Sequence, residues 1–160
     1  MQHAAMHDDA AAMREALAEA QLALVTGDVP VGAVVVGPGG DVVGRGRNAR
    51  EATGDPTAHA EILALRDAAA AHGSWRLDEY VLAVTLEPCA MCAGAAINAR
   101  VATIVFGAPD PKAGATGSLY NLAADPRLNH EPEVVSGIRA DECGRILRTF
   151  FSNRRPAADR

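Results

Sequence analysis

TAHAE at residues 57–61 and EPCAMC at residues 87–92 are the two segments around which this chain is expected to fold. Pro56 and Pro88 stand at the start of these segments, and the fixed φ of proline suits the first position of a helix. The two cysteines of the second segment are three residues apart, so their sulfur atoms share one helical face. The sequence therefore predicts two helix starts that bring one histidine and two cysteines together.

These residue types bind zinc, and a zinc site with three protein ligands keeps its fourth tetrahedral position for water. His59, Cys89 and Cys92 would supply three ligands, for one Zn²⁺ per chain. Glu61 stands two residues from His59, so it need not bind the metal to reach the water. Bound zinc lowers the pKa of water from about 15.7 to about 7, and a nearby carboxylate can then accept its proton. We therefore expect Glu61 to be the catalytic proton shuttle.

Other interpretations of these residues exist. A Cys-x-x-Cys pair alone is also typical of a redox pair or of half a structural zinc site. A lone histidine is more often part of a core than a ligand. His59 does not stand alone, because Glu61 follows it and Pro88 precedes the two cysteines. Cys143, the remaining cysteine, lies far downstream on a predicted helix and is interpreted as a small buried hydrophobic residue. As a fourth ligand it would close the site to water.

The length of 160 residues predicts a single domain over residues 1–160, with its core at about 8–155. No apolar run approaches the length of a membrane span, and the N-terminus lacks the basic start of a signal peptide. The odd number of cysteines, three, suits a reducing compartment. We therefore expect a soluble, cytoplasmic protein with no membrane partner.

The net charge of −5 argues against broad, non-specific binding to nucleic acid, although it allows a local site. Arginine clusters suit phosphate recognition, but many are solvated surface, and both interpretations stay open here. Two such groups are present: Arg45, Arg47 and Arg50, and Arg148, Arg154 and Arg155.

Alternating helical and extended patterns predict an α/β fold. An antiparallel hairpin comes first, and the strand–helix–strand units after it imply parallel strands. We expect a three-layer α/β/α sandwich with a five-stranded mixed sheet, both zinc helices on one face, and a last helix that buries Ile146, Leu147 and Phe150. The expected strands are 29–36, 42–47, 80–86, 101–106 and 133–136, and the expected helices are 8–25, 58–71, 88–99, 119–124 and one from about 141.

The two motifs match the H-x-E and P-C-x-x-C signature of zinc-dependent nucleobase deaminases. A longer ordered match, from about residue 12 to 155, makes the chain resemble the bacterial tRNA-specific adenosine deaminases of the cytidine deaminase-like superfamily. It includes VPVGA at 29–33, TLEPCAMCAGA at 85–95 and FGA at 106–108. The resemblance implies hydrolysis of the wobble adenosine to inosine in a tRNA anticodon loop, by a homodimer whose partner subunit helps to bind the RNA.

The resemblance also implies roles for residues outside the zinc motifs. Asn48 would hydrogen-bond the flipped base, and the backbone of Ala60 would contact its edge. Asp110 and Lys112 would lie on a loop that holds the flanking nucleotides. Four residues on and after the last helix would contact the anticodon loop: Phe150, Phe151, Arg154 and Arg155. For Phe150, packing in the core is an equally good explanation.

Two other functions compete with this one. A deaminase of free guanine, cytosine or a nucleoside on the same fold would suit the acidic sequence pI of about 5.5. A non-catalytic, zinc-stabilised binding module is the third hypothesis. Glu61 argues against it, because a purely structural site has no use for a carboxylate beside an open coordination position.

Overall fold

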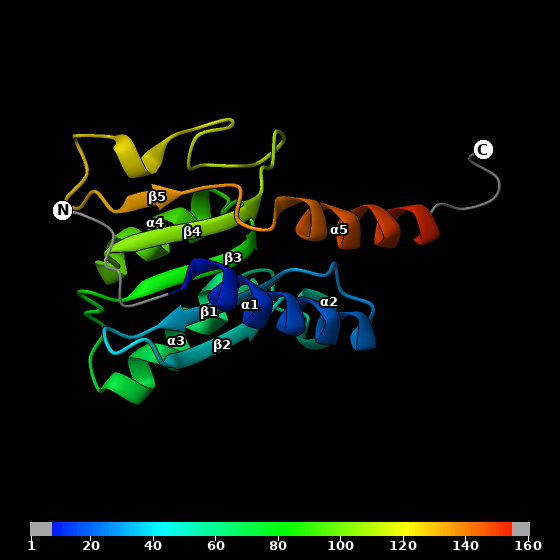
Figure 1. The fold of residues 1–160 in the computed structure, drawn as a ribbon, viewed down its shortest axis with the longest axis horizontal. Helices are drawn as coiled ribbons and strands as arrows, with labels where there is room; N and C mark the ends of the chain where they lie inside the picture. Colours follow the sequence, from blue (N-terminus) through cyan, green and yellow to red (C-terminus); the bar gives the residue numbers. More distant parts are fainter. Residues whose placement is uncertain (1–7, 155–160) are drawn as a thin grey trace.

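The computed structural model describes residues 8–154, which form a five-stranded mixed sheet (Figure 1). The strand order is β2-β1-β3-β4-β5, and β1 is antiparallel to both of its neighbours whereas β3, β4 and β5 are mutually parallel. The predicted sheet is therefore confirmed. Its strands are β1 (Gly32–Val36), β2 (Val42–Arg47), β3 (Val81–Leu86), β4 (Thr103–Ala108) and β5 (Glu133–Val135).

Helices cover both faces of the sheet and complete the predicted three-layer sandwich (Figure 1). α3 (Ala60–His72) and α4 (Ala90–Ala99) pack on one face, and α1 (Asp9–Ala23) and α5 (Ala140–Arg154) lie on the other. Side chains alternate between the two faces along each strand, so Val35 joins the core under α3 and α4 while Val34 joins the core under α1. In residues 8–154 there is no helix with the length and apolarity needed to cross a bilayer.

Glycines let two helices approach the β1–β2 hairpin closely. A Cβ atom at Gly46 would collide with the carbonyl oxygen of Ala60 and the backbone nitrogen of Ala64, both in α3. A Cβ at Gly32 would collide in the same way with the backbone of α1. Because α3 rests directly on the backbone of β2, its first residue and the preceding His59 have a fixed depth relative to the sheet.

Several predicted boundaries move by a few residues. β1 starts at Gly32, not at Val29, and β4 starts at Thr103 because the N–H of Val101 still bonds to the Ala96 carbonyl at the end of α4. The helix predicted at 119–124 is a single 3₁₀ turn, η2 (Leu122–Ala124). The helix predicted at 8–25 is α1 followed by a 3₁₀ turn, η1 (Leu24–Thr26). A one-turn helix, α2 (Arg50–Thr53), was not predicted.

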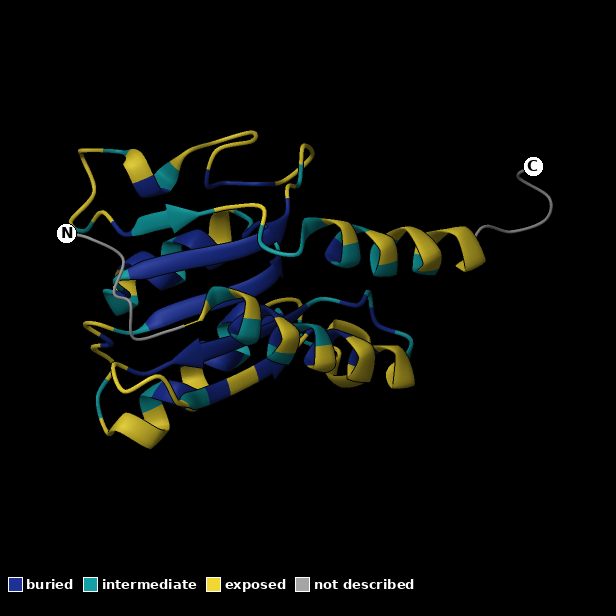
Figure 2. Cartoon of the chain, viewed as in Figure 1, coloured by how far each residue is buried: buried dark blue, intermediate teal, exposed yellow. Residues whose placement is uncertain are grey.

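The prediction that the last helix buries Ile146, Leu147 and Phe150 is wrong. These three side chains are half-exposed, and Cys143 is the fully buried residue among the described positions of α5. The reason is visible in Figure 2, where most of α5 extends beyond the end of the sheet and has no strand beneath it. Cys143 lies at the start of the helix and packs close to Gly107 of β4, as a small buried hydrophobic residue.

Candidate active site

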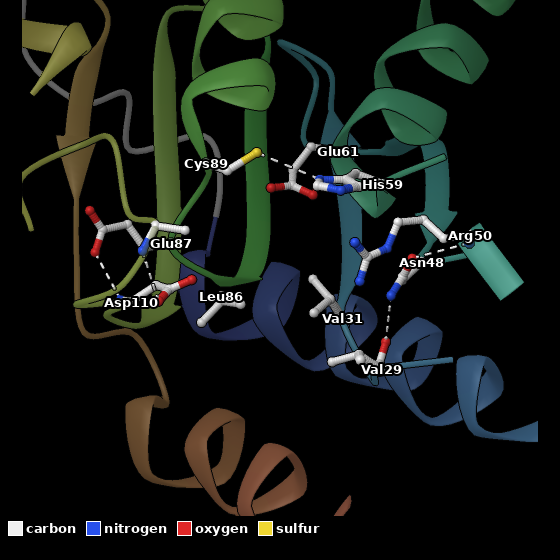
Figure 3. A pocket seen from close by; sticks show the side chains of 11 residues that line it. Val29, Val31, Asn48, Arg50, His59, Glu61, Leu86, Glu87, Cys89 and Asp110 are labelled. Atoms are coloured by element: carbon white, nitrogen blue, oxygen red, sulfur yellow. Dashed lines mark hydrogen bonds between the residues drawn. The ribbon is translucent and has the colours of Figure 1, made fainter. Parts of the chain in front are cut away.

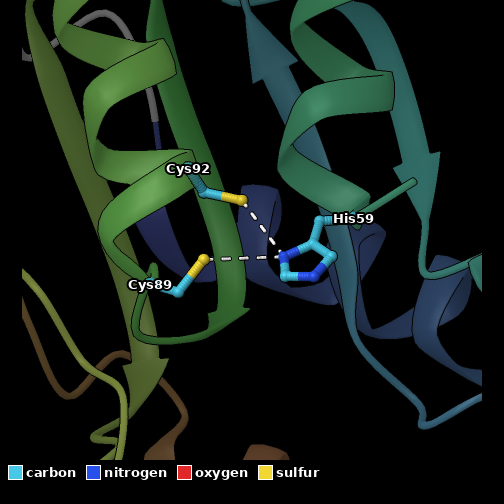
Figure 4. A group of neighbouring side chains, drawn as sticks. All are labelled: His59, Cys89 and Cys92. Carbon is cyan, nitrogen blue, oxygen red and sulfur yellow. Dashed lines mark hydrogen bonds between the residues drawn. The ribbon is translucent and has the colours of Figure 1, made fainter. Parts of the chain in front are cut away.

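The N-termini of α3 and α4 bring the predicted metal ligands together (Figure 4). His59 immediately precedes α3, Cys89 immediately precedes α4, and Cys92 lies in the first turn of α4. This corrects the expected helix start at Pro88, since the helix begins two residues later, at Ala90. The Nδ1 atom of His59 is 3.6 Å from the sulfur of Cys89 and 3.4 Å from that of Cys92.

These separations fit a zinc ion. Bonds of about 2.3 Å to sulfur and about 2.0 Å to nitrogen in a tetrahedron place neighbouring ligand atoms about 3.5 Å apart. The ligand atoms of His59, Cys89 and Cys92 all lie within 4.8 Å of one another. The pKa of the Cys89 thiol is lowered to about 3, chiefly by a hydrogen bond from Cys92 and also by one with the His59 ring. This favours the thiolate, which is the form that binds metals.

Glu61 lies in the first turn of α3, with 4% of its surface exposed. In Figure 3 its carboxylate lies between Cys89 and His59. Burial raises the pKa of the Glu61 carboxyl to about 7, and the negative charge at Cys89 adds to the effect. A carboxyl group with a pKa near neutrality can both accept and release a proton at neutral pH.

A cavity of about 220 Å³ opens beside the metal ligands (Figure 3). It is smaller than the pockets of about 300–1,000 Å³ that hold drug-sized ligands. Its walls combine apolar side chains with polar groups from two loops and from the segments at 57–61 and 87–92, the zinc segments. The lining residues are Val29, Val31, Asn48, Arg50, His59, Glu61, Leu86, Glu87, Cys89, Asp110 and Ala113.

The structure brings Asn48 to this cavity, at the end of β2, with 6% of its surface exposed. Its Nδ2 donates to the carbonyl of Val29 at 3.2 Å, and its Oδ1 accepts from the backbone N–H of Arg50 at 3.3 Å. A side-chain amide has two N–H donors and an oxygen with two lone pairs, so Asn48 keeps capacity for one more bond of each kind. Ala60 is the buried first residue of α3, directly after His59.

Asp110 lines the cavity on the opposite side, on the loop after β4. Its Oδ1 accepts from the backbone N–H groups of Lys112 at 3.0 Å and Ala113 at 3.3 Å, which closes a tight turn. Lys112 is exposed on that turn and is not among the lining residues of the cavity.

A second cavity, of about 380 Å³, lies between the end of α5 and the loops around Val29 and Arg50. Phe150 and Phe151 line it, with their rings edge to face at 5.3 Å. The Arg154 guanidinium lies 4.7 Å from the centre of the Phe150 ring and donates to the Gly27 carbonyl at 2.8 Å. Both cavities share Val29, Asn48 and Arg50, so they adjoin. Arg155 lies outside the described residues.

The arginines at 45, 47 and 50 do not form one cluster. Arg45 and Arg47 pair with acids of α1, Arg45 with Glu15 at 2.7 Å and Arg47 with Glu19 at 3.3 Å. Arg50 lies beyond the end of β2 and lines both cavities. For Arg45 and Arg47 the structure therefore favours an ion-paired surface, whereas Arg50 remains a candidate for phosphate recognition.

The sequence did not single out two buried carboxylates near the site. Asp28 accepts from the Thr26 hydroxyl at 2.6 Å and from the backbone N–H groups of Glu51 at 2.7 Å and Ala52 at 3.2 Å, which fixes the first turn of α2. Glu87 accepts bonds from the loop that carries Asp110. Glu87 stands inside the EPCAMC segment, but no local pattern indicates that an acid will be buried by a distant loop.

The site combines a histidine and two cysteines that could hold one zinc ion, a buried carboxylate beside them, and two helix N-termini over a mixed sheet. These are the features of the class of zinc-dependent deaminases. The family model that describes the cytidine and deoxycytidylate deaminase zinc-binding region matches residues 6–108. The chain belongs to this cytidine deaminase-like family and, within it, to the tRNA-specific adenosine deaminases. The predicted family, fold and zinc site are thereby confirmed.

The relatives are similar over most of the chain. The tRNA-specific adenosine deaminase of Bacillus subtilis (strain 168) is 49% identical over 146 residues, which are 91% of this chain and 90% of that protein. A tRNA(Ile)-lysidine synthase of Deinococcus radiodurans is 53% identical over 150 residues, 93% of this chain but 26% of that longer protein. A solved structure from work on A-to-I editing by tRNA:A34 deaminases at the wobble position has a TM-score of 0.82 and 43% identity, over 86% of this chain and 99% of that chain.

Proposed function

We propose that this protein hydrolyses the wobble adenosine of a tRNA anticodon loop to inosine and releases ammonia. The observation that carries the proposal is the buried Glu61 beside His59, Cys89 and Cys92, in a chain that matches a tRNA-specific adenosine deaminase over nearly its whole length. The reaction adds one water to adenosine and removes one ammonia, so it needs a nucleophilic water and a group that moves protons.

The zinc segments supply both requirements. Zinc held by His59, Cys89 and Cys92 would lower the pKa of a bound water to about 7. As the water oxygen adds to C6 of the base, the Glu61 carboxylate would take one proton from the water and pass it to the ring nitrogen. It would then carry the remaining hydroxyl proton to the amine while the C6–N bond breaks, which releases ammonia. Both cysteines lie at the N-terminus of α4, where the helix dipole favours the thiolate form that metal binding requires.

The cavity beside Glu61 holds the base. Val29, Val31 and Leu86 offer apolar surface to the base, and the spare hydrogen-bonding capacity of Asn48 fits a polar edge of the purine. The backbone of Ala60 contacts the same edge. A base reaches such a cavity after it is flipped out of the loop, and unpaired anticodon bases cost little to flip.

The flanking nucleotides lie on two sides of the cavity. Asp110 and Lys112 hold them on the side of the loop after β4. On the other side, the second cavity offers Phe150 and Phe151 as surfaces on which bases stack, and Arg154 as a phosphate contact, with Arg155 following. The side chain of Phe150 is half-exposed and lines the second cavity, which supports this role over simple core packing.

The quaternary state and location belong to the same proposal. We infer that one domain over residues 1–160 forms a homodimer whose partner subunit helps to bind the RNA, and that it acts in the cytoplasm, where tRNA is modified. Light scattering on the purified protein, which has a mass of 16.6 kDa per chain, measures how many chains associate. A monomeric mass with full activity would remove the dimer from the proposal.

The direct test of function is to incubate tRNA with the pure protein and to sequence its wobble position, where inosine is read as guanosine. We expect conversion there and no comparable ammonia release from free adenosine, guanine, cytosine or cytidine. A free-base or nucleoside deaminase, which the small cavity also fits, gives the opposite result. Release of ammonia from a free base at a rate similar to that from an anticodon stem-loop would overturn the proposal.

Arg50 should contribute a phosphate contact that Arg47 does not, because Arg50 lines both cavities whereas Arg47 is paired with Glu19. We expect Arg50→Ala to reduce the slope of log affinity against log salt for an anticodon stem-loop by about 1. Arg47→Ala is a matched control, since it removes the same charge three residues away, and it should leave the slope unchanged. If the slope of log affinity against log salt were the same in both variants, Arg50 would be a solvent-exposed residue that contacts no phosphate.

A further inference from the structure

Glu87 is a buried carboxylate that the mechanism above does not use. It follows the last residue of β3 and stands two residues before Cys89, with 2% of its surface exposed. It is not part of the metal-ligand group. Its backbone N–H donates to the carbonyl of Ala108 at 2.9 Å, which fixes its place at the carboxyl end of the sheet.

Both oxygens of the Glu87 carboxylate accept hydrogen bonds from a single loop, residues 110–118. Oε1 accepts from the backbone N–H of Asp110 at 3.0 Å and from the Ser118 hydroxyl at 2.5 Å. Oε2 accepts from the backbone N–H groups of Thr116 at 3.2 Å and Ser118 at 3.0 Å. Figure 3 shows Glu87 and Asp110 side by side at the cavity. Four neutral donors therefore converge on one carboxylate.

The loop is shaped to enclose this carboxylate. A Cβ atom at Gly114 would overlap the carboxylate of Glu87, so a glycine is needed where the loop passes closest. The N–H of Ala115 also donates to the Pro88 carbonyl at 2.8 Å, in the zinc segment itself. On its far side, the loop is held by an isolated bridge between Thr116 and Asn121 and by the bond from the Leu122 N–H in η2 to the Ala115 carbonyl at 2.9 Å. On the side of the zinc ligands, its position depends on Glu87 and on the backbone of Pro88.

The same loop supplies one wall of the first cavity, through Asp110 and Ala113. We propose that Glu87 is a positioning residue, which joins the zinc segment to the loop at 110–118 and so sets the distance between the metal ligands and the cavity wall that holds the substrate. Where it concerns RNA, this inference rests on the proposed function. Both oxygens of Glu87 are bonded to the loop, so it should act on substrate affinity more than on the chemical step.

Glu87→Gln tests the proposal because glutamine keeps the size of the side chain but has one acceptor oxygen in place of two. The N–H groups left without an acceptor cost roughly 1–3 kcal/mol, which corresponds to about 5- to 150-fold. We expect KM for an anticodon stem-loop to rise within that range while kcat stays within about threefold, the pattern of an interaction made equally in the bound and transition states. Zinc content should remain at one ion per chain.

Two further variants separate positioning from a general loss of stability. Ser118→Ala removes the hydroxyl donor alone and should raise KM in the same direction by a smaller factor, so it decides the question even if Glu87→Gln does not fold. Glu142→Gln removes a carboxylate that forms an ion pair with Arg139 and should change neither constant.

Amide hydrogen exchange gives a readout that does not depend on the reaction. In Glu87→Gln, exchange should accelerate within residues 110–118 and stay unchanged in β1 and β3. Faster exchange throughout the sheet together with loss of zinc, or an unchanged KM for both variants, would overturn the proposal. If the wild-type protein failed to act on RNA, the proposed function would fall, while localised exchange and retained zinc would still support the positioning role.

Discussion

Glu61→Gln is expected to give a folded, zinc-loaded protein that still binds an anticodon stem-loop but has lost at least a factor of about 10² to 10⁴ in turnover. Glutamine keeps the size of the side chain and can still donate and accept hydrogen bonds, but it cannot carry a proton. The loss should exceed the lower bound because two proton transfers depend on this one group. Single-turnover assays, with zinc measured on the same sample, give the value.

A matched control is Glu131→Gln, which removes an exposed carboxylate far along the chain and should leave turnover unchanged. Glu61, in contrast, is buried, and its carboxylate lies between His59 and Cys89. If Glu61→Gln kept a large fraction of the wild-type turnover with zinc in place, Glu61 would not be the shuttle, and the deaminase mechanism would have to be withdrawn.

Cys89→Ala and Cys92→Ala are each expected to lose both zinc and stability. At free zinc a thousandfold above its dissociation constant, a bound ion stabilises the folded state by about 4 kcal/mol. For a domain of this size that corresponds to a Tm change of about 8–16 °C, at about 2–4 °C per kcal/mol. Metal analysis and thermal unfolding, with and without a chelator, measure both effects.

Cys143→Ala is the control for this pair, since Cys143 is as buried as Cys92 but packs beside Gly107, away from the metal-ligand group. It should keep one zinc per chain, and a chelator should still lower its Tm. In Cys89→Ala the chelator should have no further effect. Zinc lost from Cys143→Ala and kept in Cys89→Ala would reverse the ligand assignment.

The ligand set and the sheet could be predicted from sequence because both follow from short-range patterns. The spacing of His59, Cys89 and Cys92 relative to two helix starts is local information, and strand–helix–strand units imply parallel neighbours. The burial of α5 could not be predicted in this way. An amphipathic pattern tells which face of a helix is apolar, but it does not tell whether another element lies opposite that face.

Contacts between distant segments of the chain also could not be predicted from the sequence. The bonds that Glu87 accepts from the N–H groups of Asp110 and Ser118 span 23 and 31 residues, and nothing near Glu87 in the sequence marks it as their acceptor. The different positions of three nearby arginines also depend on distant partners. Arg45 and Arg47 lie on one face of β2 and pair with acids of α1, whereas Arg50 follows the end of that strand.

The close seating of α3 on Gly44 and Gly46 has a consequence for protein engineering. Any side chain at either position would lift the helix from β2 and carry His59 away from the two cysteines, so these positions offer no useful diversity to a mutant library. Ala113 in the loop at 110–118, and Phe150 and Phe151 on α5, border the two cavities and are not among the metal ligands. A search for altered substrate preference should therefore randomise these positions and hold the hairpin and Gly114 constant.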